Sequence, residues 1–322
     1  MIGRMLTLAA VFMVATAAPA PAQEWPQQTI HLIIPFGPGG GSDIVGRVLA
    51  QALQEKLGQT VVVENRPGAG GTIGNEAIAR ADHDGYTLGI MTAGQIISAV
   101  MLKSLHYDTR TAFDPIAQVA TAGLIMVTRP DFPANNVKEL IALAKAKPGK
   151  IVFGSPGFGA TQHLAAELFK QTAGVDMLHV PFRTSPETTT ALLAGNVDVV
   201  FETVSAVLGQ VQSGRLKALA VTGMDRFPAV PNIPAAIESG VLPGYDVTTW
   251  YGVFAPHGTP PAVIARLNKT LNEVIMEPVV RERLTQAGVV VQGGTPEAFG
   301  EMMARELDRW EKVRQAAGLE KR

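Results

Sequence analysis

Two glycine-rich segments occupy positions where a chain can bind an anion. Residues 37–41 (GPGGG) and residues 67–71 (PGAGG) each follow a short apolar stretch and lead into an amphipathic one. The first N–H groups of a helix have no partners within the helix, and the helix dipole makes that end positive. Glycines also remove the Cβ atoms that would keep a ligand away from these amides. The segments predict main-chain binding of an anion such as a carboxylate, although two tight turns without a ligand have the same composition.

Hydroxyl groups and one arginine are candidates for the opposite side of such a site. Ser155, Thr161, Thr184 and Ser185 lie at or beside predicted strand-to-helix loops in the second half of the chain. Each has the chemistry to donate to a ligand oxygen, and each is equally suited to cap a helix or form a turn. Arg183 has the fork geometry that clamps a carboxylate in bidentate fashion. A solvated arginine is the alternative.

Three further titratable residues have more than one interpretation. Asp43 would repel a carboxylate ligand, so we favour an interaction with the dipole of its own helix over binding of a ligand amine. Glu202 ends a predicted strand, where it either accepts a hydrogen bond from the ligand or pairs with a residue near the hinge. His163 lies in the first turn of a predicted helix, and packing or capping is as compatible with that place as ligand contact.

Motifs for nucleotide binding and catalysis are absent from the sequence. A G-x-G-x-x-G motif that starts at Gly37 would need its last glycine at position 42, which is Ser42, and one that starts at Gly68 would need it at position 73, which is Ile73. The phosphate-binding pattern G-x-x-x-x-G-K-[ST] does not occur. Residues 154–157 (GSPG) lack the G-x-S-x-G spacing of a nucleophile elbow. The histidines form no H-x-H or H-x-x-x-H pair and there is no cysteine. We therefore expect no metal site, no cofactor and no enzymatic activity.

Strands and helices alternate along the part of the chain that must position these residues. We predict strands at 29–35, 60–64 and 86–91 and helices at 42–57 and 72–80. A second unit has predicted strands at 124–128, 151–154, 177–180, 197–201 and 216–221 and helices at 137–146, 161–172 and 188–194. Short strands joined through helices form a parallel sheet, and ligands bind at its carboxyl edge, where both glycine segments lie.

The length of the chain indicates two domains. About 300 residues remain after the leader described below, which is more than one core usually accommodates. The C-terminal part is predicted to be mainly helical, because Thr259 and Thr295 are each a helix-capping residue followed by a proline, which is typical of a helix start. It has too few predicted strands for a sheet of its own. We predict domain 1 at residues 23–122 plus 250–322 and an inserted domain 2 at residues 123–249.

The N-terminus is typical of a secretory signal peptide. Arg4 precedes the apolar residues 6–18, and the small residues Ala20 and Ala22 follow. The apolar run is shorter than the roughly 20 residues that a membrane span needs. We expect residues 1–22 to be removed by cleavage near Ala22 and the protein to be periplasmic; an uncleaved anchor is the alternative.

Composition excludes some classes of partner. The chain is 47% hydrophobic and 17% charged, with a formal net charge of −1. This balance provides no electrostatic attraction to nucleic acid or to an anionic membrane. Because the chain has no cysteine, its stability outside the cytoplasm must come from core burial instead of disulfides.

A series of short segments, in order and at specific spacing, resembles the solute-binding proteins of tripartite tricarboxylate transporters, also called the Bug family. The segments that carry the resemblance are Trp25-Pro26, residues 34–36 (IPF), 39–43 (GGGSD), 63–71 (VENRPGAGG), 84–87 (DGYT), 114–116 (DPI), 148–150 (PGK), Gly154-Ser155, His163-Leu164, residues 180–183 (VPFR), 219–222 (LAVT), Trp250 and residues 258–260 (GTP). The resemblance covers nearly the whole chain after the leader.

The resemblance implies a two-domain α/β periplasmic-binding-protein fold of type II, a Venus flytrap, with the ligand in the cleft between the domains. It implies a small organic carboxylate, held between segments that correspond to residues 36–42 and 68–72, and delivery to a transporter with one large and one small membrane subunit. The chain departs from the family pattern at residues 184–187 (TSPE). The identity of the ligand is therefore not transferable.

We predict a monomeric periplasmic receptor for an organic carboxylate that closes about a hinge. A secreted enzyme that uses the same cleft and a sensor for a membrane signalling protein are the rival functions. The candidate ligand-binding residues are Phe36, Gly39, Gly40, Gly41, Ser42, Asp43, Gly70, Gly71, Thr72, Thr92, Ser155, Gly157, Thr161, His163, Arg183, Thr184, Ser185 and Glu202.

Overall fold

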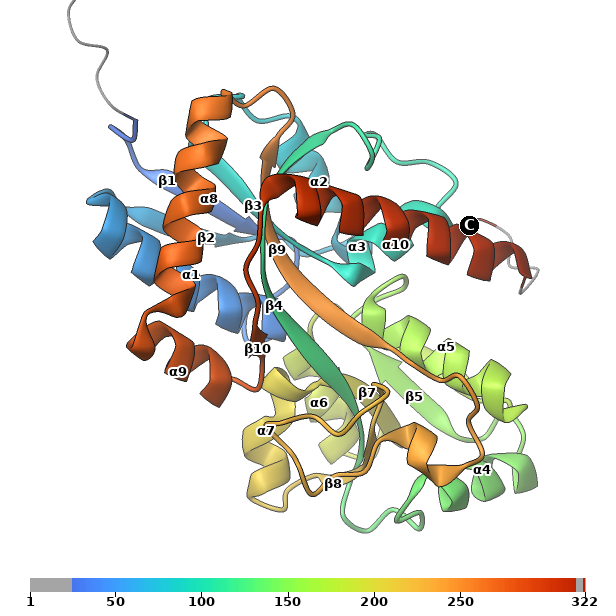
Figure 1. Cartoon of the computed structure of the whole chain (residues 1–322). Coiled ribbons are helices and arrows are strands. Elements are labelled where there is room, and N and C mark those ends of the chain that lie inside the picture. Colours follow the sequence, from blue (N-terminus) through green and yellow to red (C-terminus); the bar gives the residue numbers. More distant parts are fainter. Residues whose placement is uncertain (1–24, 317–320, 322) are drawn as a thin grey trace, which may run out of the picture.

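The computed structural model describes residues 25–316 and residue 321, which form two lobes joined by long strands (Figure 1). The predicted signal peptide, residues 1–22, lies outside the described residues. Within the part that the structure describes, no helix is both long and apolar enough to cross a lipid bilayer.

The first lobe is built from both ends of the described chain. In chain order its elements are β1 (Ile30–Ile34), α1 (Gly41–Leu57), β2 (Val61–Asn65), the 3-10 helix η1 (Ala69–Gly71), α2 (Thr72–Ala79), β3 (Thr87–Thr92), α3 (Ala93–Met101), β9 (Thr248–Pro256), α8 (Pro261–Met276), α9 (Pro278–Gln286), β10 (Val290–Val291) and α10 (Pro296–Ala316). Strand β1 pairs in parallel with β2 and β3, so the carboxyl ends of all three strands lie at one edge.

Two hydrophobic clusters fill the two faces of the first-lobe sheet. One face packs against α1, α8 and α9 through side chains such as Leu49, Leu267 and Leu284, and the other packs against α3 and α10 through side chains such as Ile97 and Phe299. Helices α1 and α8 lie side by side (Figure 1). The C-terminal helices thus belong to the first lobe.

The second lobe repeats the arrangement with its own sheet. Its elements are α4 (Val137–Ala146), β5 (Val152–Ser155), α5 (Thr161–Ala173), β6 (Leu178–Pro181), α6 (Ser185–Leu193), β7 (Val199–Thr203), α7 (Val204–Gln212), β8 (Lys217–Val221) and η2 (Ala236–Ser239). Strand β5 pairs in parallel with β6 and β7. Phe153, Phe169 and Phe201 are fully buried in the cluster on the α4 and α5 side.

One long strand, β4 (Phe113–Thr128), belongs to both lobes. It pairs with β9 as far as Gly123, and from Leu124 onward it pairs with β7. The strand order is therefore continuous across the molecule, β2-β1-β3-β9-β4-β7-β5-β6, with β8 and β10 each attached to β4. We propose that the lobes divide at this change of partner and at the start of β9, which corresponds to domains of residues 23–122 plus 250–322 and 123–249.

The α/β fold was predicted correctly, but several of its elements were not. Helix α4 has the predicted bounds, and the other predicted strands and helices are present with small shifts. Helices α3 and α7, strand β9 and the first half of β4 had no counterpart in the prediction. Helix α3, strand β9 and the first half of β4 are buried along most of their length, so they lack the regular spacing of polar and apolar residues that periodicity detects.

Candidate functional site

A small cavity lies between the two lobes. It has a volume of about 30 Å3, which is room for about two water molecules. Both lobes and β9 contribute to its wall. The residues that line it are Phe36, Gly37, Gly40, Gly41, Ser42 and Thr92 of the first lobe, Pro156, Thr161, Gln162, Arg183, Thr184, Ser185 and Thr203 of the second lobe, and Thr249 and Tyr251 of β9.

The N-termini of five helices meet at this cavity. Gly40 is the N-cap of α1, Thr92 of α3, Thr184 of α6 and Thr203 of α7, while Thr161 is the first residue of α5. Each helix N-terminus carries roughly half a positive charge. Because all five positive ends converge on one space, the cavity is suited to an anion.

Main-chain donors are available on both sides of the cavity. Among the described residues, no acceptor takes the amide N–H of Gly41 or Ser42 in α1, of Thr161 or Gln162 in α5, or of Ser185 in α6. These are first-turn amides, which have no partner within their own helices. They can donate to a bound carboxylate, and such charge-assisted bonds are stronger than neutral ones.

Glycines of the first segment lie where the two lobes touch. A Cβ atom on Gly37 would overlap the side chain of Thr184, and a Cβ atom on Gly41 would overlap the hydroxyl of Tyr251. Gly40 has more room, because nothing comes closer to its would-be Cβ than 3.5 Å. Glycine at positions 37 and 41 therefore lets the opposing lobe and β9 approach, in addition to leaving main-chain amides open to a ligand.

The structure brings together half of the predicted site residues. Those that line the cavity are Phe36, Gly40, Gly41, Ser42, Thr92, Thr161, Arg183, Thr184 and Ser185. Arg183 is exposed at the rim, and its guanidinium forms no ion pair with any described residue. Those that lie outside the lining are Gly39, Asp43, Gly70, Gly71, Thr72, Ser155, Gly157, His163 and Glu202.

The second glycine segment supports the lobe contact without lining the cavity. A Cβ atom on Gly70 would lie 2.5 Å from the carbonyl oxygen of Phe158 in the second lobe. The Ser98 hydroxyl lies 3.3 Å from both the Gly70 and the Gly159 carbonyl oxygens, so it links the lobes. The Thr72 hydroxyl donates to the Ala69 carbonyl instead of facing a ligand.

Asp43 is used within the first lobe. Its carboxylate accepts hydrogen bonds from the Gly39 amide (3.0 Å), the Arg47 Nε (2.9 Å) and the Asn65 Nδ2 (2.9 Å). Burial on its own would raise the pKa of Asp43, but these hydrogen bonds and the Arg47 charge outweigh it and lower the pKa. The carboxylate therefore holds the glycine segment to α1 and β2, in addition to lying near the positive end of its own helix.

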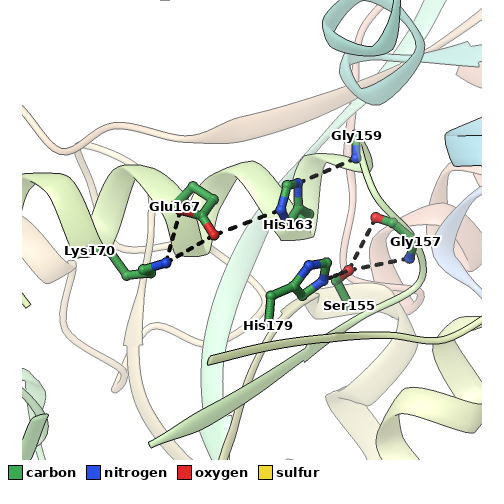
Figure 2. Close-up of polar contacts among 7 residues, drawn as sticks. All are labelled: Ser155, Gly157, Gly159, His163, Glu167, Lys170 and His179. Atoms are coloured by element: carbon green, nitrogen blue, oxygen red, sulfur yellow. Dashed lines mark hydrogen bonds and ion pairs between the residues drawn. The ribbon is translucent and has the colours of Figure 1, made fainter. Parts of the chain in front are cut away.

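Ser155, Gly157 and His163 belong to a network of polar and ring contacts on the second lobe (Figure 2). The Ser155 Oγ lies 2.7 Å from His179 Nε2 and donates to the Gly157 carbonyl at 3.1 Å. The Gly159 amide donates to His163 Nδ1 at 3.3 Å. This network shapes residues 155–159, which face Gly70 across the lobe contact.

Glu202 lies beneath the cavity and is wholly buried. Its Oε1 accepts hydrogen bonds from the Gln162 Nε2 (2.8 Å) and from the Thr203 amide (2.7 Å). Its Oε2 has no hydrogen-bond partner among the described residues. Burial raises the pKa of the Glu202 carboxyl, and the hydrogen bonds offset only part of that effect.

Five lining residues were not predicted: Pro156, Gln162, Thr203, Thr249 and Tyr251. Gly37 lines the cavity as part of the predicted first glycine segment. Gln162 and Thr203 are sequence neighbours of the predicted Thr161 and Glu202, so a rule that includes the whole first turn of each helix would have found them. Thr249 and Tyr251 come from β9, which the sequence patterns did not reveal. Among the described residues, no group of three or more His, Asp or Glu side chains is arranged to hold a metal ion.

Related sequences extend over almost the whole chain. A family model described as "Tripartite tricarboxylate transporter family receptor" matches residues 45–319. A UPF0065 protein from the tcbD-tcbE intergenic region of Pseudomonas sp. strain P51 is 37% identical over 315 residues, which cover 97% of this chain and 94% of that protein. Protein BugT of Bordetella pertussis is 35% identical over 319 residues, 98% of each chain.

Solved structures share the fold. The periplasmic binding protein BugD superposes with a TM-score of 0.89 at 36% identity, covering 92% of this chain and 100% of that one. A Rhodopseudomonas palustris protein solved with adipate has a TM-score of 0.89 at 32% identity, with 92% and 99% of the two chains covered. MatC from the same organism, with bound malate, has a TM-score of 0.86 at 30% identity, with 90% and 99% covered.

These relatives are solute-binding receptors and not enzymes, and they have the two-domain α/β fold of periplasmic binding proteins. The family match begins within α1, at residue 45, and extends over both lobes, including α5 and α6, whose N-termini face the cavity. The chain is a member of the tripartite tricarboxylate transporter receptor family, to which the Bug proteins belong.

Proposed function

We propose that this protein captures a small organic carboxylate between its lobes in the periplasm and delivers it to a membrane transporter with one large and one small subunit. The observation that carries the proposal is the convergence of five helix N-termini on a cavity whose lining contains no Asp or Glu. The adipate and malate in two structural neighbours support a carboxylate as the ligand.

The free amides of α1, α5 and α6 have the strength to hold a carboxylate without a buried cation. A hydrogen bond to a charged group contributes roughly 1.5–3 kcal/mol. Two such bonds from Gly41 and Ser42, with one from Thr161 or Ser185, would supply much of the roughly 8 kcal/mol that a micromolar dissociation constant requires. Arg183 at the rim is in a position to contact a second acidic group.

Entry of the ligand requires the lobes to separate. A cavity of about 30 Å3 is smaller than an organic acid of several carbon atoms, since one water molecule already needs about 10–15 Å3. Strands β4 and β9 are the connections that pass from one lobe to the other. We infer that they form the hinge about which the lobes open and close.

A thermal-shift screen over mono-, di- and tricarboxylates, with and without a chelator, tests the binding function. A ligand at 100 times its dissociation constant should stabilise the protein by about 2.7 kcal/mol. We expect at least one acid to do so, equally well in chelator, and to be recovered unchanged. Conversion of the acid into a product would favour an enzyme, and no stabilisation by any carboxylate would contradict the proposal.

The location and the transport partner need experiments in cells. We expect the periplasmic protein to start near Gln23 in an intact-mass measurement. Deletion of the gene should abolish uptake of the radiolabelled acid that the screen identifies, and a plasmid copy should restore it. Uptake that is unchanged by the deletion would contradict a transport role and would favour a sensor.

A further inference from the structure

Helix α5, which supplies two main-chain donors to the cavity, begins without a conventional cap. Its N-cap residue is Ala160, whose side chain cannot accept a hydrogen bond. The side chain of His163, in the first turn, reaches back instead, and the Gly159 amide donates to its Nδ1 at 3.3 Å. Glutamate or glutamine at this position of a helix usually plays that part. An imidazole in its place makes the contact sensitive to protonation.

The contact with Gly159 defines the state of the His163 ring. An imidazole nitrogen accepts a hydrogen bond only while it carries no proton, so the ring is neutral and its proton is on Nε2. Both residues are buried. Protonation of Nδ1 would turn the acceptor into a donor, and the buried Gly159 amide would lose its partner. Such a loss is unfavourable, so we expect the segment around Gly159 to move when His163 is charged.

Gly159 joins the start of α5 to the first lobe. Its carbonyl oxygen lies 3.3 Å from the Ser98 hydroxyl of α3, and the same hydroxyl lies 3.3 Å from the Gly70 carbonyl oxygen. The amides of Thr161 and Gln162, which line the cavity, follow shortly after Gly159 in the chain. A displacement of Gly159 therefore alters the lobe contact and the position of two ligand donors together.

A second imidazole, that of His179 on β6, packs against His163, and Figure 2 shows the two rings side by side. Their ring centroids are 4.3 Å apart. The His179 Nε2 lies 2.7 Å from the Ser155 Oγ, which donates to the Gly157 carbonyl. Two positive charges at this distance repel, so the rings titrate as a coupled pair. Both rings contact the loop that precedes α5.

The surroundings of the pair favour its neutral form. The other titratable residues that the described structure places around it are Glu167, Lys170, Asp176, Glu202 and Tyr245. Glu167 Oε1 lies 3.8 Å from His163 Nε2, but Lys170 lies 3.1 Å from the same carboxylate and offsets its charge. Strand β5 and helix α3, which pack against α5, contain no charged residue. The positive N-terminus of α5 also disfavours a cation in its first turn.

We propose that the neutral His163–His179 pair fastens the N-terminus of α5 in its ligand-binding position, and that protonation of the pair in acid releases it and weakens ligand binding. Histidine is the side chain whose charge ordinarily changes between pH 5 and 8. Both histidines are positioning residues, because they act on the amides of α5 and not on the ligand. The effect on affinity rests on the carboxylate-binding function proposed above, whereas the effect on residues 155–162 does not.

Hydrogen exchange of the ligand-free protein at pH 7.5 and 5.5, corrected for the chemical exchange rate, tests the release. In the parent, residues 155–162 should exchange severalfold faster at pH 5.5. The double variant His163→Gln/His179→Gln should exchange equally at both pH values, because glutamine can accept the Gly159 amide and gains no proton. The matched control is His106→Gln, an exposed histidine that pairs with Glu76 of the first lobe, and it should behave like the parent.

Nitrogen-15 NMR of the histidine rings tests the proton states in the parent itself, without relying on the folding of any variant. We expect His163 at pH 7.5 to be neutral with its proton on Nε2, and the pair to gain a proton by pH 5.5. A proton on His163 Nδ1 at pH 7.5, or a pair that stays neutral at pH 5.5, would overturn the proposal. So would an exchange rate of residues 155–162 that is unchanged in acid, or raised equally in the double variant.

Calorimetry with adipate and with malate at the same two pH values tests the effect on binding. A group with the ordinary histidine pKa of about 6.5 gives a loss of about 10-fold over this range. We expect the parent and His106→Gln to lose about that much more affinity in acid than the double variant, since titration of the acids is common to all. His163→Leu, which has no acceptor, should bind more weakly than the parent at both pH values.

Failure of this proposal and failure of the receptor function are distinguishable. If an acid binds and its affinity has the same pH dependence in the parent and in the double variant, the histidine pair does not control binding, and the receptor function stands. If neither adipate, malate nor any other acid of the carboxylate screen binds, the receptor function is contradicted, while exchange and NMR still decide whether the pair holds the start of α5.

Discussion

A hydrogen bond of 2.8 Å joins the Gln162 side chain, which lines the cavity, to the Glu202 carboxyl, which is wholly buried beneath it. The same carboxyl oxygen accepts the Thr203 amide that starts α7. One buried acid thus holds the first turns of two helices, α5 and α7, in place at the cavity. A change in the charge of Glu202 would alter its hydrogen bonds to Gln162 and Thr203, and both of these residues line the cavity.

The stability of the parent protein should depend on pH through Glu202. Burial raises its folded-state pKa above the ordinary value of 4.5, so the folded protein holds a proton that the unfolded chain releases above that pH. The contribution of Glu202 to stability therefore falls as pH rises from 4.5 toward the folded pKa, by up to about 1.4 kcal/mol per pH unit. Glu202→Gln has no such proton to lose.

Urea unfolding of the parent and of Glu202→Gln at pH 5 and pH 7.5 measures this effect. The variant should become more stable relative to the parent as the pH is raised between the two conditions. The same difference in unfolding free energy at both pH values would show that Glu202 does not titrate abnormally.

Gly41→Ala should weaken ligand binding through the lobe contact. Its Cβ would overlap the Tyr251 hydroxyl and come within 2.6 Å of Ser205 Oγ. We expect a loss of at least about 10-fold in affinity, equivalent to about 1.4 kcal/mol, and a larger radius of gyration by small-angle scattering with ligand present. A variant that closes and binds like the parent would contradict the role assigned to this glycine.

Gly209→Ala is the matched control for that substitution and a prediction in its own right. Gly209 lies on the exposed side of α7, and a Cβ there meets nothing within 4 Å. Alanine is favoured over glycine inside a helix by roughly 0.8–1 kcal/mol. Denaturant unfolding should show a gain of about that size, with unchanged ligand affinity in calorimetry; a loss of stability would indicate a backbone geometry different from that of α7.

Asp43→Asn should destabilise the first lobe at neutral pH. The substitution removes the charge that pairs with Arg47 and accepts the Gly39 amide, and hydrogen bonds to a charged group contribute roughly 1.5–3 kcal/mol. The folded-state pKa of Asp43 lies below its ordinary 3.8, so this stabilisation is present above that value and is lost as the pH falls through the folded pKa. The unfolding free energies of the parent and the variant should differ at pH 7 and become equal in acid. A difference in unfolding free energy that persists in acid would argue against a charge effect.

Local patterns were sufficient to predict the first half of the site. The glycines of residues 37–41 and the apolar spacing of α1 are adjacent in sequence, so the sheet edge and the amides of Gly41 and Ser42 follow from short-range information. The hydroxyls of Thr161 and Thr184 were found in the same way, because each starts a helix with a recognisable first turn.

Long-range contacts account for what the sequence patterns missed. Tyr251 reaches the cavity because β9 pairs with β4, and Tyr251 itself is opposite Ala120, which is far away in the chain. Strand β9 contains Gly252 and is buried along nearly its whole length, so it shows no alternation. The use of Asp43 within its own lobe depends on Asn65 at the end of β2, and no spacing rule connects these two residues.

A crystal structure of the protein with the acid that stabilises it most tests the central claim most directly. We predict a carboxylate group between the lobes with its oxygens about 2.7–2.9 Å from the amide nitrogens of Gly41 and Ser42, and with donors from α5 or α6 on its other side. An acid bound outside this cavity, or one whose carboxylate is held by side-chain cations while the amides of α1 stay without an acceptor, would contradict the account.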